Sequence, residues 1–216
     1  MSQHFVPACG GPGYTIEDDG HINVDGLGRI VRPWDSPTCH GKNVERWRSL
    51  ISESAAKHGV PEAWIAGMMY QESCGNDRAV SPAGAQGLMQ IMPFNAKNLT
   101  QEELLDPATN IDIGAKIIRS HANLFKWNVV NVIATYNMGS TRCYAGRYCK
   151  HESLWSFDTD CDYVPQCVRG INAAIDHGFS GTGSSLSESS SSSGALAVAA
   201  AFVAPFAAWW WWKHNR

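Results

Sequence analysis

The chain has 216 residues, seven cysteines and a formal net charge of −3 at pH 7. This length suits one domain of ordinary size with appendages, and the slightly negative charge provides no basic field for binding nucleic acid. The cysteine spacings do not match a zinc site and no His-Glu-x-x-His motif occurs, so we expect no metal and no other cofactor.

Residues 1–40 are rich in glycine and proline and are predicted to form an N-terminal extension. The turn signals Asp19-Gly20 and Asp25-Gly26 separate three short β-like runs, at 14–17, 21–24 and 29–31. This pattern predicts a small hairpin or meander that leads into the main domain. The alternative is a substrate-binding arm.

Apolar residues at helical spacing predict a mainly α domain over residues 41–178. The first amphipathic helix is expected over 44–58, and Gly59 ends it. Pro61, a favoured first helical position, then starts a helix that runs to Glu72. Three more helices are predicted: one that Asn110 caps and that extends to Phe125, one over 129–138, and a last one that begins near Val164 and ends near Gly178.

Glu72 is the most informative residue of these helices. Steps of three and four residues place it on the same face as Ile65, Met68 and Met69. A carboxyl group on an apolar face is costly to ionise, so its pKa should rise and it can carry a proton at neutral pH. The alternative is a surface carboxylate at a helix end. A loop of small residues follows, and the apolar segment 87–93 after it is predicted to be a second helix.

The C-terminal part of the chain changes composition abruptly. Residues 179–194 are nearly all serine and glycine and are predicted to be a flexible linker. Residues 195–212 then form an uncharged run that contains Pro205 and ends in four tryptophans, beside Lys213 and Arg216. A helix needs about 20 apolar residues to cross a bilayer, and tryptophans beside basic residues suit a membrane interface. We therefore expect 195–216 to be a hydrophobic membrane segment; the alternatives are an interfacial segment and a tail buried in a larger assembly.

Three blocks of residues stand out in order along the predicted domain. The first runs from Glu72-Ser73 through Ala-Val-Ser-Pro-Ala-Gly-Ala (79–85) to Gly-Leu-Met-Gln-Ile-Met-Pro (87–93). The second is Ala134-Thr135-Tyr136-Asn137-Met138-Gly139, and the third is Tyr163-Val164-Pro165. Together they resemble the soluble lytic transglycosylases, lysozyme-like enzymes that cut the glycan strands of peptidoglycan. There are departures: Cys74-Gly75 stands where this family often has Gly-Phe, Met138 replaces a small residue, and Thr159-Asp160 replaces a common Glu-Thr pair.

This resemblance implies a reaction that needs one carboxyl group, where most glycosidases need two. Glu72 would protonate the bond between MurNAc and GlcNAc, and the N-acetyl group of the substrate would stabilise the sugar cation. The same residue would then take a proton from the MurNAc C6 hydroxyl, which gives a 1,6-anhydro sugar.

The resemblance also implies roles for five more residues. Ser81 and Gln90 would lie along the saccharide groove, Tyr136 would place its hydroxyl near Glu72 or the N-acetyl group, and Tyr163 would reach the same cleft. Asn137 would hold the local structure. Structural alternatives are a turn at Ser81-Pro82 and a helix end at Asn137.

Other functions are also considered. Asp77 could position water, so that hydrolysis by a muramidase replaces the anhydro product; its alternative is a solvated loop or turn residue. Cys74 with a histidine such as His121 could form a cysteine peptidase that acts on cross-links, although a helix end does not lower a thiol pKa. A non-catalytic murein-binding or assembly protein is the third class.

The cysteines and the start of the chain bear on the compartment. Cys143/Cys149 and Cys161/Cys167 are close-spaced pairs, and a Cys9/Cys39 disulfide could close the N-terminal segment. Cys74 would then have no partner. Disulfides would imply an oxidising compartment. Residues 1–7 do not predict a signal peptide. We therefore expect a membrane-associated phage virion protein that acts on peptidoglycan in the host periplasm, with other virion proteins as partners. The alternative is a transglycosylase of a cell or a conjugation system.

Overall fold

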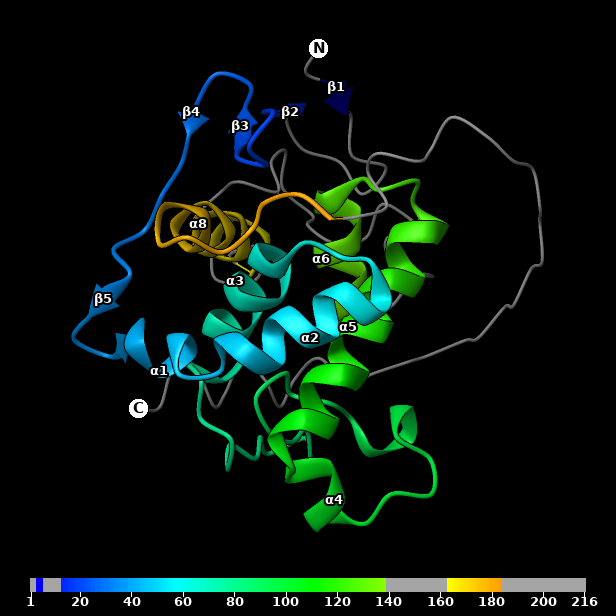
Figure 1. Cartoon of the computed structure of the whole chain (residues 1–216). Coiled ribbons are helices and arrows are strands. Elements are labelled where there is room, and N and C mark those ends of the chain that lie inside the picture. Colours follow the sequence, from blue (N-terminus) through cyan, green and yellow to red (C-terminus); the bar gives the residue numbers. More distant parts are fainter. Residues whose placement is uncertain (1–2, 6–12, 139–162, 184–216) are drawn as a thin grey trace.

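The computed structural model describes residues 3–5, 13–138 and 163–183 (Figure 1). These residues form a mainly helical domain with a small β-sheet near the N-terminus, which confirms the predicted fold class. Within the described ranges no helix has the length and apolar character that crossing a membrane requires. The predicted membrane segment, 195–216, lies outside these ranges.

The N-terminal sheet is an antiparallel meander, as predicted. Its strands follow one another in the order β1 (Gln3–Phe5), β2 (Tyr14–Ile16), β3 (Ile22–Val24) and β4 (Gly28–Arg29). Gly20 and Gly26 make the turns with positive φ angles of 96° and 75°. Tyr14, Ile22 and Val24 are completely or almost completely buried in the main core. The sheet therefore packs on the core of the domain, as expected of an extension that leads into it.

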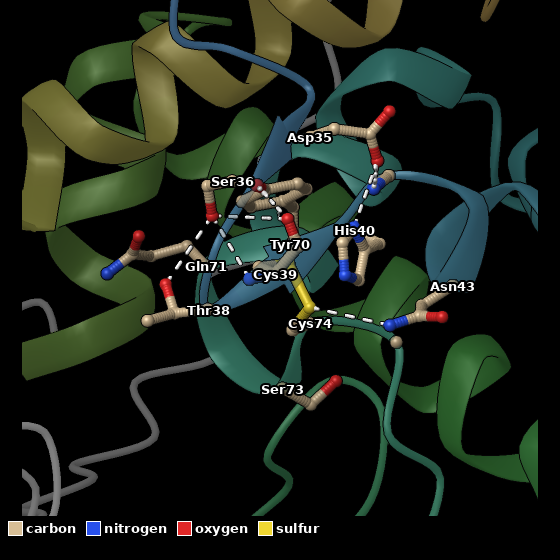
Figure 2. Close-up of a disulfide and its surroundings, with 12 residues drawn as sticks. Asp35, Ser36, Thr38, Cys39, His40, Asn43, Tyr70, Gln71, Ser73 and Cys74 are labelled. Carbon is tan, nitrogen blue, oxygen red and sulfur yellow. Dashed lines mark hydrogen bonds and ion pairs between the residues drawn. A yellow bond between two sulfur atoms is a disulfide. The ribbon is translucent and has the colours of Figure 1, made fainter. Parts of the chain in front are cut away.

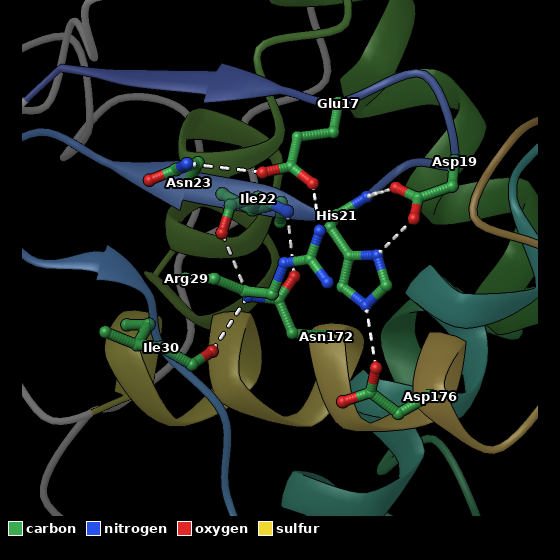
Figure 3. A network of polar contacts seen from close by, with 9 residues as sticks. All are labelled: Glu17, Asp19, His21, Ile22, Asn23, Arg29, Ile30, Asn172 and Asp176. Atoms are coloured by element: carbon green, nitrogen blue, oxygen red, sulfur yellow. Dashed lines mark hydrogen bonds and ion pairs between the residues drawn. The ribbon is translucent and has the colours of Figure 1, made fainter.

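A polar network ties this sheet to α8 (Tyr163–Asp176) (Figure 3). The buried His21 lies between two carboxylates, with Nδ1 2.8 Å from Asp19 and Nε2 3.1 Å from Asp176. Asn172 of α8 accepts a hydrogen bond from the backbone N–H of Ile22 and donates to the carbonyls of Ile22 and Ile30. The side chain of Asn172 thus completes backbone pairing that the short strands leave open.

The next part of the chain packs along the central helix. A two-stranded ribbon of β5 (Asp35–Ser36) and β6 (Cys39–His40) leads to α1 (Lys42–Glu45) and α2 (Arg48–His58). The single helix predicted over 44–58 is therefore divided at Arg46-Trp47. The physical reason is a tertiary contact: the side chains of Arg46 and Trp47 both donate to the carbonyl of Gly75. Gly59 ends α2 in the left-handed conformation, as predicted.

Helix α3 (Glu62–Ser73) is the centre of the fold. Ten of its residues are buried, so it is apolar all round, as expected of a core helix. It crosses α8 at a close distance, because a Cβ at Gly67 would collide with the backbone of Ile171. Pro61 is extended and immediately precedes the helix, so the helix begins at Glu62, one residue later than predicted. The last turn of this rigid helix carries Glu72.

The remaining helices are a short 3-10 helix η1 (Pro93–Asn95), α4 (Gln101–Leu105), α5 (Pro107–Leu124) and α6 (Val129–Met138). Of these, α5 packs on α3, α4 packs on α5, and α6 packs on α5 and α8. The predictions for α6 and α8 are confirmed. The prediction that Asn110 caps a helix is wrong, because Asp106 caps α5 by accepting from Thr109 N–H at 2.9 Å, and Pro107 sets its first turn.

Residues 179–183 pack on the domain and do not begin a free linker as predicted. Phe179 is 2% exposed, and its ring lies near Trp34 and beneath the guanidinium of Arg48. The carbonyl of Ser180 accepts from Ala63 N–H at 3.0 Å, at the start of α3. The packed part of the chain therefore extends at least to Gly183.

Candidate active site

Glu72 lies in the buried last turn of α3 and faces Tyr163. Its side chain is almost fully enclosed, with 5% of the residue exposed. The Tyr163 hydroxyl donates to Oε1 of Glu72 at 2.5 Å. Burial, with further contributions from Cys167 and Glu72, raises the pKa of Tyr163 well above its usual value, so the phenol keeps its proton and remains a donor. Two residues predicted for the site are thus in direct contact.

Tyr136 comes from α6 and contacts the loop that follows α3. Its hydroxyl donates to the carbonyl of Met89 at 2.8 Å. Burial and then the charge of Glu72 raise the pKa of Tyr136 well above its usual value, so this hydroxyl is also protonated. The charge of Glu72 therefore acts on the Tyr136 hydroxyl, and the hydrogen bond of that hydroxyl connects α6 to the loop after α3.

The second helix predicted over 87–93 is wrong. The segment forms a folded loop in which Gln86 and Ile91 exchange backbone hydrogen bonds of 3.0 and 2.9 Å. Gly84, Gly87 and Gln90 have positive φ angles of 86°, 74° and 47°, which an α-helix does not allow. Leu88, Met89 and Ile91 are buried in this loop as they would be in a core helix, and a short apolar run in the sequence does not distinguish the two cases. We call residues 79–91 the active-site loop.

Ser81 and Gln90 hold the active-site loop together. The Ser81 hydroxyl accepts from Ala85 N–H at 3.0 Å, as in the predicted turn. The Gln90 amide donates to the carbonyls of Ala79 and Gly87 at 3.2 and 2.9 Å. Both residues are buried. Their contact with a saccharide remains a prediction.

Asn110 has a role in the active-site loop that the sequence does not indicate. It is completely buried in α5, and Oδ1 accepts from Met89 N–H at 2.7 Å. Nδ2 donates to the carbonyls of Gln86 and Leu104 at 3.0 and 2.8 Å. A polar residue ahead of an apolar run had the pattern of a cap, but here its side chain replaces the backbone partners that the irregular loop lacks.

Ser73 is a second residue whose structural role the sequence does not indicate. It follows Glu72, is buried, and its hydroxyl donates to the carbonyl of Leu88 at 2.7 Å. The end of α3 is thereby joined to the active-site loop at the position next to the candidate acid. Its place beside Glu72 in the first block is the signal that could have identified it.

Asn137 and His121 carry buried nitrogens without a hydrogen-bond partner among the described residues. These atoms are Nδ2 of Asn137 and Nδ1 of His121. Burial lowers the pKa of His121 to about 4, and its ring meets that of Tyr136 edge-on. The structural role expected of Asn137 stays a prediction, because residues 139–162 lie outside the described ranges.

Asp77 forms an ion pair with Arg46. Its carboxylate accepts from Arg46 at 3.0 Å, and the same guanidinium donates to the carbonyl of Gly75 at 3.1 Å. This arrangement anchors the turn after α3 to α1 and agrees with the structural reading of Asp77. It offers no support for Asp77 as a second carboxylate of the reaction.

Cys74 forms a disulfide with Cys39, so the predicted Cys9/Cys39 pair is wrong (Figure 2). The cysteine peptidase hypothesis is wrong as well, because a sulfur in a disulfide is not a thiolate nucleophile. Cys9, Cys143, Cys149 and Cys161 lie outside the described ranges.

One group in the described part of the chain has the composition of a metal site. Glu17, Asp19 and His21 bring their ligand atoms within 4.8 Å of one another. Both nitrogens of His21 already face carboxylates, and Arg29 pairs with Glu17 (Figure 3). The hydrogen bonds of the polar network therefore account for this group.

Comparison with known proteins agrees with this geometry. Residues 49–150 match the Transglycosylase SLT domain. A transglycosylase of Enterobacteria phage PRD1 is 34% identical over 118 residues, which are 50% of this chain and 44% of that protein. The soluble lytic murein transglycosylase of Escherichia coli (strain K12) is 36% identical over 106 residues, 44% of this chain and 16% of that protein. The chain thus spans less than half the length of these relatives.

Two solved structures share the fold. The 70-kDa soluble lytic transglycosylase in complex with bulgecin A has a TM-score of 0.54 and 28% identity, over 66% of this chain and 26% of that chain. An inactive Glu-to-Gln mutant of lytic transglycosylase Slt from Pseudomonas aeruginosa has a TM-score of 0.52 and 27% identity, over 60% of this chain and 24% of that chain. The helical core around Glu72 has the lysozyme-like fold of these proteins, and residues 49–150 are similar in sequence to their transglycosylase SLT domain.

Proposed function

We propose that this chain is a peptidoglycan lytic transglycosylase in which Glu72 is the single acid and base. The observation that carries this proposal is the enclosed Glu72 carboxyl with the Tyr163 hydroxyl at 2.5 Å. An enclosed carboxyl group can hold a proton for the leaving oxygen, and a fixed phenol donor stabilises the carboxylate that forms when the proton is given up. The bond cleaved is the β-1,4 bond between MurNAc and GlcNAc.

The reaction returns the proton to Glu72 without consuming water. Glu72 first gives its proton to the glycosidic oxygen, and the bond from that oxygen to C1 of MurNAc breaks. The N-acetyl oxygen of the same sugar stabilises the developing positive charge at C1. The C6 hydroxyl then attacks C1 and passes its proton to the Glu72 carboxylate. The product is a 1,6-anhydro-MurNAc end, and Glu72 is ready for another cycle.

One observation favours one carboxylate over the pair that a hydrolase uses. Asp77, the acidic residue nearest to Glu72 along the chain, is bound by Arg46. The inactive mutant of the Pseudomonas Slt carries a Gln in place of a Glu, which supports an essential carboxyl group and fits either mechanism. A muramidase on the same fold is the second candidate, and product analysis separates the two.

The proposed setting is local opening of the bacterial cell wall by a phage during entry or exit. The similarity to the phage PRD1 transglycosylase supports this setting, and the runner-up is a cellular or conjugation-system enzyme. The substrate would be peptidoglycan glycan strands, with other virion proteins as further partners. The segment 195–216, with its apolar run 195–212, would attach the chain to a membrane.

The test is a Glu72→Gln variant with mass spectrometry of the products. Removing the transferable proton should lower turnover of isolated murein by about 100- to 10,000-fold, while the wild type yields 1,6-anhydro ends. Glu53→Gln, at an exposed position on α2, is the matched control and should keep full activity. Near-normal turnover by folded Glu72→Gln would refute the assignment. Reducing MurNAc ends from the wild type would show hydrolysis instead.

A further inference from the structure

The disulfide between Cys39 and Cys74 connects the N-terminal part of the chain to the end of the helix that carries Glu72 (Figure 2). Cys39 lies in β6, and Cys74 is the C-cap of α3, two positions after Glu72. The carbonyl of Cys39 also accepts from the Tyr70 hydroxyl at 3.0 Å. Cys39 therefore contacts α3 on both sides of Glu72, once covalently and once through a hydrogen bond.

The backbone of Cys74 shows why a cysteine at this position needs an explanation. Its φ of 54° is in the left-handed region, which a glycine adopts freely and a side chain opposes. The soluble lytic transglycosylases that the sequence resembles often have glycine here. A cysteine lacks the freedom of glycine to adopt this conformation. What its side chain adds is the covalent bond to Cys39.

Non-covalent contacts join the same two segments. Asn43 Nδ2 lies 3.9 Å from the sulfur of Cys74. The Gly75 carbonyl accepts from Arg46 and Trp47 at 3.1 and 3.0 Å. Residues 39–47 thus contact the turn after α3 at several positions. Among the described residues, the disulfide is the one covalent bond between these two segments.

We propose that the Cys39–Cys74 disulfide positions Glu72 and makes catalysis depend on the redox state of the surroundings. A dithiol reductant would supply two electrons and two protons, convert the disulfide into two thiols and itself become a cyclic disulfide. Two thiol sulfurs cannot remain at bonding distance, so the chain at Cys39 and the end of α3 move apart. Because Glu72 is two residues away, its carboxyl shifts relative to Tyr163 and the active-site loop. The enzyme is then active in an oxidising compartment and weak in a reducing one.

This inference rests on the proposed role of Glu72, and the experiment compares oxidised and reduced wild-type protein. We measure kcat and KM on a soluble glycan substrate before and after treatment with dithiothreitol. Thiol labelling with mass mapping establishes that Cys39 and Cys74 are reduced, and circular dichroism follows the fold. A small misplacement of a catalytic group costs up to about 100-fold, so kcat should fall about 10- to 100-fold. KM should stay within about twofold, and reoxidation should restore kcat.

The matched variant is Cys39→Ser/Cys74→Ser, which should have the low kcat of the reduced enzyme and ignore the reductant. The inference is overturned if the reduced wild type keeps its kcat, or if the double variant equals the oxidised enzyme. A reductant response that persists in the double variant would place the effect at other cysteines and also overturn it. Loss of the circular dichroism signal on reduction would mean that the bond is a folding staple, with no positioning role. Glu72→Gln tests the proposed function independently of the disulfide. Near-normal turnover by this variant under oxidising conditions would refute the proposed function, whether or not the wild type responds to the reductant.

Discussion

The Tyr163 hydroxyl donates to Oε1 of Glu72 at 2.5 Å across 91 positions of sequence. Glu72 comes from the last turn of α3 and Tyr163 from the first residue of α8. The two helices meet so closely at Gly67 that no Cβ fits there, so their relative position is fixed by backbone packing. The core of the domain therefore holds the donor on the candidate acid before any substrate arrives.

Tyr163→Phe should reduce kcat about 10- to 100-fold, because a hydrogen bond to a charged group contributes about 1.5–3 kcal/mol. A donor favours the ionised carboxyl group, so its loss should help Glu72 keep the proton that it must give, and the alkaline limb of the pH–rate profile should move to higher pH. The measurement is kcat against pH for both proteins. Tyr136→Phe is the comparison, because its hydroxyl bonds to Met89 instead. An unchanged pH profile for Tyr163→Phe would count against the role of this hydrogen bond.

Asn110→Ala should destabilise the domain by about 3 kcal/mol or more. The substitution leaves the N–H of Met89 and the carbonyls of Gln86 and Leu104 buried without their amide partner. Urea unfolding at pH 7 measures the loss. Asn95→Ala, at an exposed position in η1, is the control and should change stability by less than about 0.5 kcal/mol. Equal midpoints for the two variants would show that the loop does not need Asn110.

Local patterns in the sequence predicted α3, α6, α8 and the face that carries Glu72. Helical periodicity placed Glu72 with Ile65 and Met68, and all three are buried. The turns at Gly20 and Gly26 were predictable for a similar reason, since a positive φ strongly favours glycine.

Features that depend on distant residues were not predictable. The run from Gly87 to Pro93 is apolar enough for a helix, but its shape comes from Asn110, a residue on another helix. Spacing likewise paired Cys39 with Cys9, whereas the fold brings Cys39 to Cys74. Pairing is decided by which residues meet in three dimensions, and spacing alone does not contain that information.

The stability of the domain should fall as the pH drops below about 4. Hydrogen bonds from the backbone N–H and then the side chain of Thr109 hold the pKa of Asp106 below its usual value of 3.8. A carboxyl group with a lowered pKa contributes stability above its unfolded pKa, and this contribution is lost as the pH falls through the folded pKa. Asp106→Asn keeps a capping side chain without the titrating group. Its urea midpoint should therefore change less between pH 5 and about pH 2.5 than that of the wild type; an equal change would contradict the prediction.

Truncation after Gly183 should leave a soluble, folded and active enzyme. The residues removed contain the serine- and glycine-rich segment, which cannot build a packed core, and the apolar run 195–212. Burying each methylene of such a run is worth about 0.8 kcal/mol, so the full chain should instead partition with liposomes or detergent. Sedimentation with liposomes and turnover of isolated murein are the measurements. A full-length protein that stays monomeric without detergent and ignores liposomes would refute the membrane tail.

Truncation after Gly178, five residues earlier, should behave differently. It removes Phe179, which is 2% exposed and lies near Trp34 and Arg48. It also removes the Ser180 carbonyl that accepts from Ala63 at the start of α3. Loss of a buried phenylalanine side chain costs about 3–5 kcal/mol, a large part of the stability of an ordinary domain. The melting temperature of this shorter protein should therefore fall well below that of the protein ending at Gly183. Equal melting temperatures would show that residues 179–183 contribute nothing to the fold and that the packed chain ends at Gly178.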